Sequence, residues 1–590
     1  MTVYRAPLQD IEFLYRYVLD LAGICELPSF EHVEPDLVSG ILEEAARFME
    51  EVVAPTNRIG DTVGAIHNED GSVTMPPEIR AAYAKYVAAG WNAVTGSAEY
   101  GGHQFPGLVA IATQEMMTTA NMALSLNPML TASTILALEQ HGSDEQKARY
   151  LEKLISGEWT GTMVLTEPEA GSDVGALTTK AEPAEDGTWH LTGNKIFITW
   201  GEHDVAENII HLVLARTPGA PPGTRGISLF LVPKFLVEAD GTLGARNDVT
   251  CVSLEHKIGI HASPTCVLAF GEQAGAVAYL VGEEHHGMRA MFTMMNDARL
   301  KIGVEGLAIS ERAYQHALEF AGERAQGAAP GEPPGTASPI IEHPDVRRML
   351  LTMKSNVEAM RALMYDTAAS LDVSRHHPDP AVAAVAAGRA ELLTPITKAW
   401  GSDLGVEMTS LAIQVLGGMG YVEESGAGQL WRDSRIAPIY EGTNGIQAID
   451  LVMRKLPMDE GAVITGFLLD VEAVAVALRA ASATDRLGDV LAAAVADVAA
   501  ATAWLATRSD ATDRLAGATP YLRMLGIVAG GYYLGRSALA AAAAGEHVAF
   551  HHEKVETARF YIEQIVPRAA GLRPAVEAGA PALYATPLAD

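Results

Sequence analysis

The stretch Leu165-Thr166-Glu167-Pro168-Glu169-Ala170-Gly171-Ser172-Asp173 lies near the start of a region whose residue pattern differs from the patterns before and after it. Before it, from about residue 36 to 157, apolar residues recur three and four positions apart, as on the buried face of a helix. From about 161 to 272, short β-rich runs alternate with turn residues, and helical periodicity then returns. The sequence therefore predicts a mainly helical protein with a β domain inserted between helical regions.

Short apolar and β-branched runs in the middle region are expected to be strands. They cover residues 189–192, 195–199, 209–214, 227–232 and 266–270. The turn signals Glu185-Asp186-Gly187 and Thr217-Pro218-Gly219 favour hairpin connections. In the all-helical region before them, Pro77 is suited to open a helix, and Ser143 with Gln146 forms a capping-box pattern.

Two long helical regions follow the strands. The first, from about 287 to 456, is broken by a Pro- and Gly-rich stretch at 327–339 that we expect to be an exposed loop. The second is Ala-rich and runs from about 462 to the end. We therefore predict an N-terminal helical domain at 1–160, a middle β domain at 161–280, a helical bundle at 281–460 and an additional C-terminal helical domain at 461–590.

Charge and cysteine content limit the classes of partner. With 73 acidic against 42 basic side chains, the chain carries a formal net charge of −31, which disfavours nucleic acid and anionic lipid surfaces. Its three cysteines are too few for a disulfide framework or a zinc cluster, which indicates a reducing compartment. Adjacent His285 and His286 rarely face one ion, so we expect no metal site.

The ends of the chain carry no evident targeting signal. Charged residues interrupt the first 20 positions, unlike the apolar core of a secretory signal. The apolar run at 524–535 is shorter than the roughly 18 residues that a membrane span needs. We expect a cytoplasmic protein without a membrane span.

Three further segments carry candidate chemistry. In Ile439-Tyr440-Glu441-Gly442-Thr443-Asn444 a carboxylate stands among small residues just before an apolar, helix-like run. Lys195-Ile196-Phe197-Ile198-Thr199 is an alternating strand with an aromatic residue. The stretch from Gln414 to Tyr421 contains glycines, but because no strand precedes it, it is not a dinucleotide-binding fingerprint. A helix C-cap is the structural alternative there.

The segments at 165–173 and 439–444 together resemble the acyl-CoA dehydrogenase family, and the resemblance covers roughly residues 30 to 460. It implies that family's fold: an N-terminal helical domain, a middle β-barrel domain and a C-terminal helical bundle. The extra C-terminal helices and the segment at 323–327 resemble the long bacterial branch of the family, which includes the 3-methylmercaptopropionyl-CoA dehydrogenases.

The resemblance also implies an activity. It makes the chain an oxidoreductase that converts an acyl-CoA, with 3-methylthiopropionyl-CoA as a candidate, to the trans-2-enoyl-CoA. Glu441 then abstracts the α proton, FAD takes the β hydride, and electron-transfer flavoprotein accepts the electrons. Some family branches place the base just before the arginine that corresponds to Arg299, but that position is Ala298 here.

The remaining site residues follow from the same resemblance. We expect FAD to be bound by Thr166, Ser172, Phe197, Thr199, Arg324, Gln414, Gly418 and Thr443. We expect acyl-CoA to be bound by Ser172, Arg299, Glu441 and Gly442. Arg324 resembles an arginine that reaches the FAD pyrophosphate across a subunit boundary, which implies a homo-oligomer, either a dimer or a dimer of dimers.

Two alternatives remain open at this point. An acyl-CoA oxidase of the same fold passes its electrons to oxygen and makes peroxide. A non-catalytic relative binds acyl-CoA or a partner protein without chemistry. The presence of Glu441 together with both flavin-like segments argues against the second alternative.

Overall fold

The computed structural model describes residues 3–481, 484–544 and 548–588. These residues form two compact units. One comprises Met1–Arg47, Pro106–Thr119 and Arg299–Asp590, and the other comprises Phe48–Phe105 and Ala120–Ala298. The first is a helical bundle and the second contains the sheet, so the fold is that of a mainly α protein with a β domain.

The sheet of the second unit has the strand order β10-β11-β5-β12-β7-β6-β3, and β4 pairs with both β5 and β6. Its strands are β3 (Trp159–Val164), β4 (Lys180–Pro183), β5 (Trp189–Thr199), β6 (Asn208–Arg216), β7 (Ile227–Pro233), β10 (Val249–Leu254), β11 (Thr265–Phe270) and β12 (Ala276–Val281). Because β4 bridges β5 and β6, the strands β4, β5, β12, β7 and β6 close into a ring. The apolar residues of β6 and β7 are fully buried along both strands, so both faces of these strands are covered.

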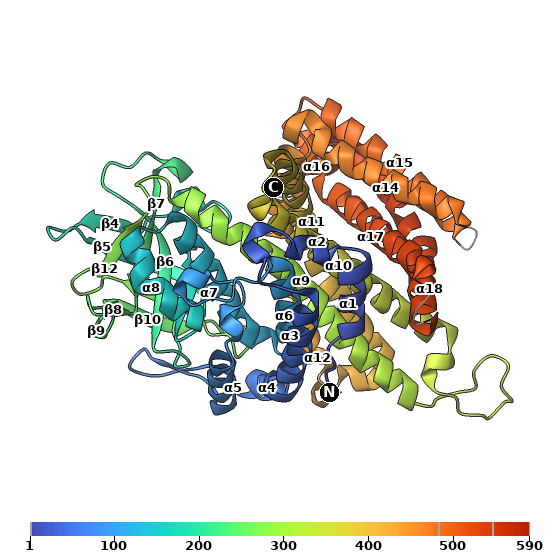
Figure 1. Cartoon of the computed structure of the whole chain (residues 1–590), viewed down its shortest axis with the longest axis horizontal. Coiled ribbons are helices and arrows are strands. Elements are labelled where there is room, and N and C mark those ends of the chain that lie inside the picture. The colour runs from blue at the N-terminus through green and yellow to red at the C-terminus, as the bar shows by residue number, and fades with distance from the viewer. Residues whose placement is uncertain (1–2, 482–483, 545–547, 589–590) are drawn as a thin grey trace. The chain divides into compact units, whose positions relative to one another are not determined.

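Helices and short strands complete this unit. The helices are α4 (Thr56–Val63), α5 (Pro77–Ala88), α7 (Met122–His141) and α8 (Asp144–Ser156). In Figure 1, α7 and α8 lie beside the blue-green strands, and α7 packs against β3. The pairs β1 (Ile66–His67) with β2 (Val73–Thr74) and β8 (Phe235–Val237) with β9 (Leu243–Arg246) form two small separate sheets. The predicted capping box of Ser143 and Gln146 is confirmed at the start of α8.

The first unit is a bundle of helices. Its N-terminal members are α1 (Leu8–Tyr17), α2 (Leu21–Cys25), α3 (Pro35–Phe48) and α6 (Gly107–Ala120), and its longest are α9 (Gly287–Glu323, from Arg299 onward), α10 (Pro344–His376) and α11 (Pro380–Leu416). The C-terminal helices include α14 (Ala462–Ala480), α15 (Asp485–Thr507), α17 (Ala518–Ala543) and α18 (Val548–Gln564). Helix α17, red in Figure 1, packs against α10, α11, α14, α15 and α18, so the C-terminal helices share a core with the bundle.

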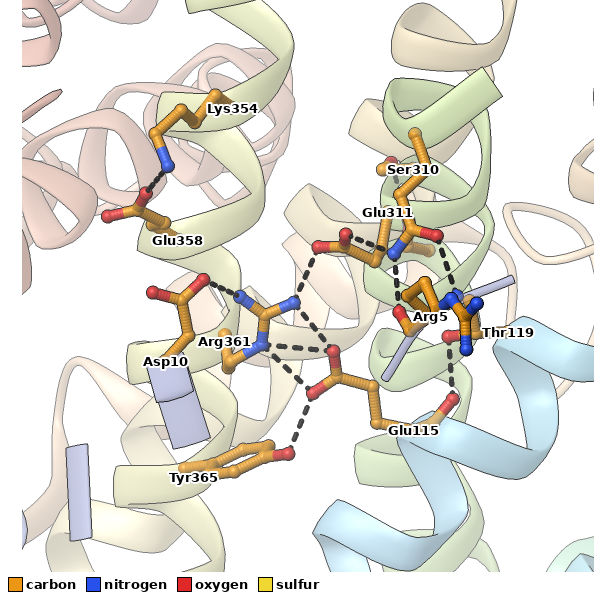
Figure 2. Close-up of polar contacts among 12 residues, drawn as sticks. Arg5, Asp10, Glu115, Thr119, Ser310, Glu311, Lys354, Glu358, Arg361 and Tyr365 are labelled. Atoms are coloured by element: carbon orange, nitrogen blue, oxygen red, sulfur yellow. Dashed lines mark hydrogen bonds and ion pairs between the residues drawn. The ribbon is translucent and has the colours of Figure 1, made fainter. Parts of the chain in front are cut away.

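A buried ion network crosses the bundle (Figure 2). Arg361 of α10 is fully buried, and its Nη2 atom lies 2.7 Å from carboxylate oxygens of both Glu115 in α6 and Glu311 in α9. The Tyr365 hydroxyl donates to the other Glu115 oxygen at 2.7 Å. The Arg361 Nη1 atom lies 3.4 Å from Asp10 of α1. One guanidinium therefore links four helices, and each buried charge has a partner.

Two expectations about strands were wrong. The runs at 189–192 and 195–199 are parts of one strand, β5, because Gly193 and Asn194 continue the pairing with β11. The N-terminal region is not entirely helical, because Asn68 and Gly71 close a turn between β1 and β2, where the Gly71 amide donates to the Asn68 carbonyl at 3.0 Å. The expected loop at 327–339 is confirmed, since α9 ends at Glu323 and α10 begins at Pro344.

Among the residues that the structure describes, two helical segments are long and apolar enough to span a membrane by length and composition alone. They are Met458–Ala480 and Arg486–Thr507, with hydropathies of 1.9 and 1.7 and with 28% and 33% of the apolar window buried. The run at 524–535 considered from sequence belongs instead to the buried helix α17. The most apolar late segments are thus the outer helices α14 and α15, which the sequence analysis did not single out.

Candidate active site

Glu441 stands on a strained turn that leads into helix α13 (Asn444–Asp450). Its φ angle is 55°, and that of Gly442 is 84°. For a residue with a Cβ atom this left-handed conformation is uncommon and is maintained only when the surroundings fix it. A side chain at position 442 would be strained by this φ angle, and its Cβ atom would displace the Gln447 Nε2 atom, which would lie 2.8 Å away. The backbone therefore favours glycine at position 442, whereas the left-handed conformation of Glu441 is maintained by its surroundings.

Hydrogen bonds from both sides hold this turn. The Thr443 hydroxyl caps α13 by accepting from the Ile446 amide at 3.3 Å. The Gln447 amide group donates to the carbonyls of Glu441 and Gly442 at 3.4 and 3.3 Å. The Asn444 amide N–H donates to the Pro438 carbonyl at 3.0 Å. Together these bonds fix the backbone on each side of Glu441.

Two cations act on the Glu441 carboxyl. Burial raises its pKa above the ordinary value, and Arg299 and Lys398 partly oppose this by favouring the charged form. Arg299, expected from sequence, is 5% exposed, and its Nη2 atom would lie 3.7 Å from a Cβ atom on Gly442. The structure therefore brings Arg299, Glu441 and Gly442 together. The result is a carboxylate with a raised pKa beside a guanidinium.

Close contact between α9 and α11 brings these groups together. A Cβ atom on Gly306 would lie 2.1 Å from the Gly401 carbonyl oxygen, and one on Gly303 would lie 2.6 Å from the Thr397 carbonyl oxygen. Only glycine allows two helix backbones to approach so closely. Arg299 of α9 and Lys398 of α11 consequently reach the same turn.

In the sheet unit, the segment at 165–173 follows β3 and is tied to β5. The Thr166 carbonyl accepts from the Ile196 amide at 2.9 Å. Glu167 lies 2.8 Å from the Lys195 ammonium, and both side chains are buried, at 4% and 0% exposure. Its oxygens also accept from the amides and hydroxyls of Thr178 and Thr179. Glu167 is thus structural, and it places Thr166 beside the segment at 195–199.

A β-bulge turns Phe197 out of β5. Ile196 and Phe197 together oppose the single residue Val267 of β11, and the φ angle of Phe197 is 59°. The extra residue shifts the alternation, so Ile198 is buried and Phe197 is 58% exposed. An exposed aromatic residue beside Thr166 and Thr199 fits the ring of a flavin. Ser172, in the exposed loop after Thr166, provides a further hydroxyl.

The other expected flavin ligands lie in the helical unit. Gln414 and Gly418 are exposed at the end of α11. Gly417, with a φ angle of 59°, is the C-cap of this helix, which is the structural alternative considered for the segment. Arg324 is exposed immediately after α9, and its Nη2 atom donates to Gln326 at 3.1 Å. Along α9, Arg324 is about 36 Å from Arg299, since a helix rises about 1.5 Å per residue. One chain therefore does not bring Arg324 to Glu441.

Two buried ionisable groups next to Glu441, Lys398 and Glu305, were not predicted from the sequence. Lys398 donates to the Asn444 Oδ1 atom at 2.8 Å. Glu305 accepts a hydrogen bond from the Tyr440 hydroxyl. Each is a single charge among apolar helix residues, and that isolation is the signal that could have identified them.

Comparisons with known families cover most of the chain. Three matches are described as the N-terminal, middle and C-terminal domains of acyl-CoA dehydrogenase, over residues 39–158, 162–272 and 285–456. A fourth, described as acetyl-CoA dehydrogenase C-terminal like, covers residues 467–587. The C-terminal helices thus correspond to a recognised domain type.

Known relatives extend over nearly the whole chain. The 3-methylmercaptopropionyl-CoA dehydrogenase of Ruegeria pomeroyi is 45% identical over 95% of this chain and 96% of its own length. The broad-specificity linear acyl-CoA dehydrogenase FadE5 of Mycobacterium tuberculosis is 35% identical over 98% of both chains. The structure of an acyl-CoA dehydrogenase complexed with FAD from Bacillus anthracis shares the fold, with a TM-score of 0.74 at 20% identity over 94% of this chain and 90% of that one.

Proposed function

The chain belongs to the acyl-CoA dehydrogenase family, and on that premise we propose that Glu441 is the base that removes the α proton of the acyl-CoA thioester. Family membership makes the chain an FAD-dependent acyl-CoA dehydrogenase. FAD supplies the hydride acceptor for the β hydrogen, a capacity that no side chain has. The chain itself must supply a base, a means of polarising the thioester and a fixed geometry.

The observation that carries the proposal is the strained turn at Glu441, with its φ angle of 55° and Arg299 next to it. Backbone strain of this kind is concentrated at functional sites. Burial raises the Glu441 pKa toward the pH at which the enzyme works, and a base acts best when its pKa is near that pH. The positive charge of Arg299 opposes this rise by favouring the charged carboxylate.

The backbone of the same residue supports a second role. Within the described part of the chain, the Glu441 amide N–H donates to no acceptor. We assign this N–H to the thioester carbonyl, whose oxygen gains negative charge as the α proton leaves. The base and the N–H group that donates to the thioester carbonyl then belong to one residue, so the turn fixes their relative geometry.

For the acyl group we propose 3-methylthiopropionyl-CoA. The support is the 45% identity to 3-methylmercaptopropionyl-CoA dehydrogenase across nearly the full length of both chains. The enzyme should be mixed anaerobically with propionyl-, butyryl-, 3-methylthiopropionyl-, isovaleryl- and palmitoyl-CoA, and the loss of visible flavin absorbance followed. We expect the fastest bleaching with the thioether substrate. Faster bleaching by a straight-chain ester would reject the thioether assignment and identify the straight-chain acyl-CoA as the preferred substrate. If no ester bleached the flavin, the proposed dehydrogenation would be rejected.

The electron acceptor is proposed to be electron-transfer flavoprotein, since the relatives are dehydrogenases. The test compares turnover by the reduced enzyme with oxygen and with an electron-transfer flavoprotein. Faster turnover with the flavoprotein supports the proposal. Faster turnover with oxygen, with stoichiometric peroxide, would assign the chain to the oxidases.

We further propose that two chains complete each flavin site. Arg324, Gln414 and Gly418 are exposed, and Arg324 is about 36 Å along α9 from Arg299. A guanidinium is suited to bind a pyrophosphate with two hydrogen bonds. Light scattering should give at least a dimer, and Arg324→Ala should lower the bound FAD per chain. A monomer with full FAD content would reject this assignment.

A further inference from the structure

Glu305 is a fully buried carboxyl directly beneath the catalytic turn. It belongs to α9 and has 0% exposure. The hydroxyl of Tyr440, the residue before Glu441, donates to its Oε2 atom. Its Oε1 atom has no hydrogen-bond partner among the residues that the structure describes. A charged carboxylate with so few partners is costly inside a protein, so this site favours the neutral acid.

The groups that face Glu305 come from two elements besides its own helix. Tyr440 and Glu441 lie on the turn, and Lys398 lies on α11. Lys398 gives its hydrogen bond to Asn444 at 2.8 Å, and the Asn444 amide group donates in turn to Asp403 at 2.7 Å. Lys398 therefore anchors the far side of the turn, while Glu305 holds the near side through Tyr440.

Burial determines the protonation of these groups. It raises the pKa of Glu305 to about 8, and the Glu441 charge acts in the same direction, against the Tyr440 hydrogen bond and Lys398. Burial also lowers the pKa of Lys398 to about 7, against the carboxylates of Glu441, Glu305 and Asp403 and together with the positive charge of Arg299. Near neutral pH, Glu305 is therefore mainly the neutral acid.

We infer that Glu305 is a positioning residue for the base: its buried carboxyl accepts a hydrogen bond from the Tyr440 hydroxyl and thereby fixes the strained turn that presents Glu441. The inference rests on the proposed role of Glu441. A left-handed Glu441 persists only if both sides of the turn are anchored, and Glu305 provides the anchor before it.

The first test uses a double-mutant cycle. Glu305→Met removes the acceptor and Tyr440→Phe removes the donor. Each should slow anaerobic flavin reduction by about tenfold, the effect of one lost hydrogen bond, while acyl-CoA binding is retained. Because the two residues share one bond, the double variant should be no slower than the slower single variant. Additive losses would overturn the inference, and if Glu305→Met does not fold, an undiminished rate in Tyr440→Phe would do the same.

The second test is rescue by a conservative substitution. Glu305→Gln keeps a carbonyl oxygen that can accept from the Tyr440 hydroxyl but cannot ionise, so this variant should reduce the flavin at close to the wild-type rate and faster than Glu305→Met, which has no acceptor. A Gln variant as slow as Glu305→Met would overturn the inference.

Glu441→Gln separates this inference from the proposed function. If that variant still reduces the flavin at the wild-type rate, Glu441 is not the base and the proposed function fails first. If that variant is inactive while the Glu305 and Tyr440 variants match the wild type, only the role of Glu305 is rejected.

Discussion

The ion pair of Glu167 with Lys195 is the residue-scale feature that fixes the flavin-like segment. Burial alone would raise the Glu167 pKa, but Lys195 and the Thr178 and Thr179 hydrogen bonds outweigh it and hold the pKa at about 2. Because this folded-state pKa lies below the ordinary value of 4.5, the pair contributes stability above pH 4.5 and loses it as the pH falls toward 2.

Glu167→Gln should therefore lower the free energy of unfolding at pH 7 by about 3 kcal/mol, because Lys195 is left buried without its counter-charge. The matched control is Glu169→Gln, two positions later and exposed, which should change the stability by less than about 0.5 kcal/mol. Denaturant unfolding and FAD content measure both effects. Equal stability of the two variants would show that the pair does not hold the segment.

Residues of the site differ in how far the sequence alone could identify them. Glu441 and Gly442 were predictable because they lie in one short segment with a recognisable order. The contacts of Lys398 and Glu305 with this turn were not predictable, since only the packing of separate helices brings these two residues to it. The raised pKa of Glu441 likewise depends on burial, which a sequence does not display.

At the scale of elements, the glycine contact between α9 and α11 positions the site. Gly306→Ala would place a Cβ atom 2.1 Å from the Gly401 carbonyl oxygen, so the helices must move apart. We expect a loss of about 1–3 kcal/mol in unfolding free energy and slower flavin reduction, because Arg299 and Lys398 would no longer meet at Glu441.

Gly322→Ala is the control in the same helix. A Cβ atom there meets nothing within 4 Å, so the variant should be as stable as the wild type or up to about 1 kcal/mol more stable. Thermal unfolding measures the stability of both variants, and stopped-flow absorbance measures their rates of flavin reduction. If Gly306→Ala behaves like Gly322→Ala, the close helix contact is not what places the two cations.

Element prediction succeeded where the signal is local. The capping box of α8, the turn between β6 and β7 and the loop between α9 and α10 each follow from a few neighbouring residues. The continuous strand β5 was missed because Gly193 and Asn194 read as a turn, although pairing with β11 keeps them extended. The Phe197 bulge was missed for a similar reason, since it depends on register across two strands.

At the scale of the helical unit, buried charges attach the C-terminal helices to the bundle. Lys554 of α18 forms ion pairs with Asp10 of α1 and with Glu358 of α10, the latter at 3.0 Å. Burial would raise the Asp10 pKa, but Lys554 and then Arg361 lower it to about 2. This contribution to stability is present above the ordinary value of 3.8 and is lost as the pH falls through about 2.

Lys554→Met should lower the unfolding free energy by about 1–3 kcal/mol, because Asp10 and Glu358 each lose one of two cations and keep only Arg361 and Lys354, respectively. The acid unfolding midpoint should also move to higher pH, since Asp10 would then bind its proton more readily. Arg559→Gln, on the same helix but with a partly exposed pair, is the control and should have an effect below about 1 kcal/mol. An unchanged acid midpoint in Lys554→Met would contradict this role.

Flavin reduction in Glu441→Gln tests the central claim most directly. The variant should be mixed anaerobically with 3-methylthiopropionyl-CoA and with butyryl-CoA in a stopped-flow instrument, beside the wild type and the exposed control Glu424→Gln. With Glu441 as the base, flavin reduction falls by about 10²- to 10⁴-fold with both substrates, while FAD content, acyl-CoA binding and the control remain at wild-type levels. Reduction of the Glu441→Gln flavin at the wild-type rate would contradict the assignment.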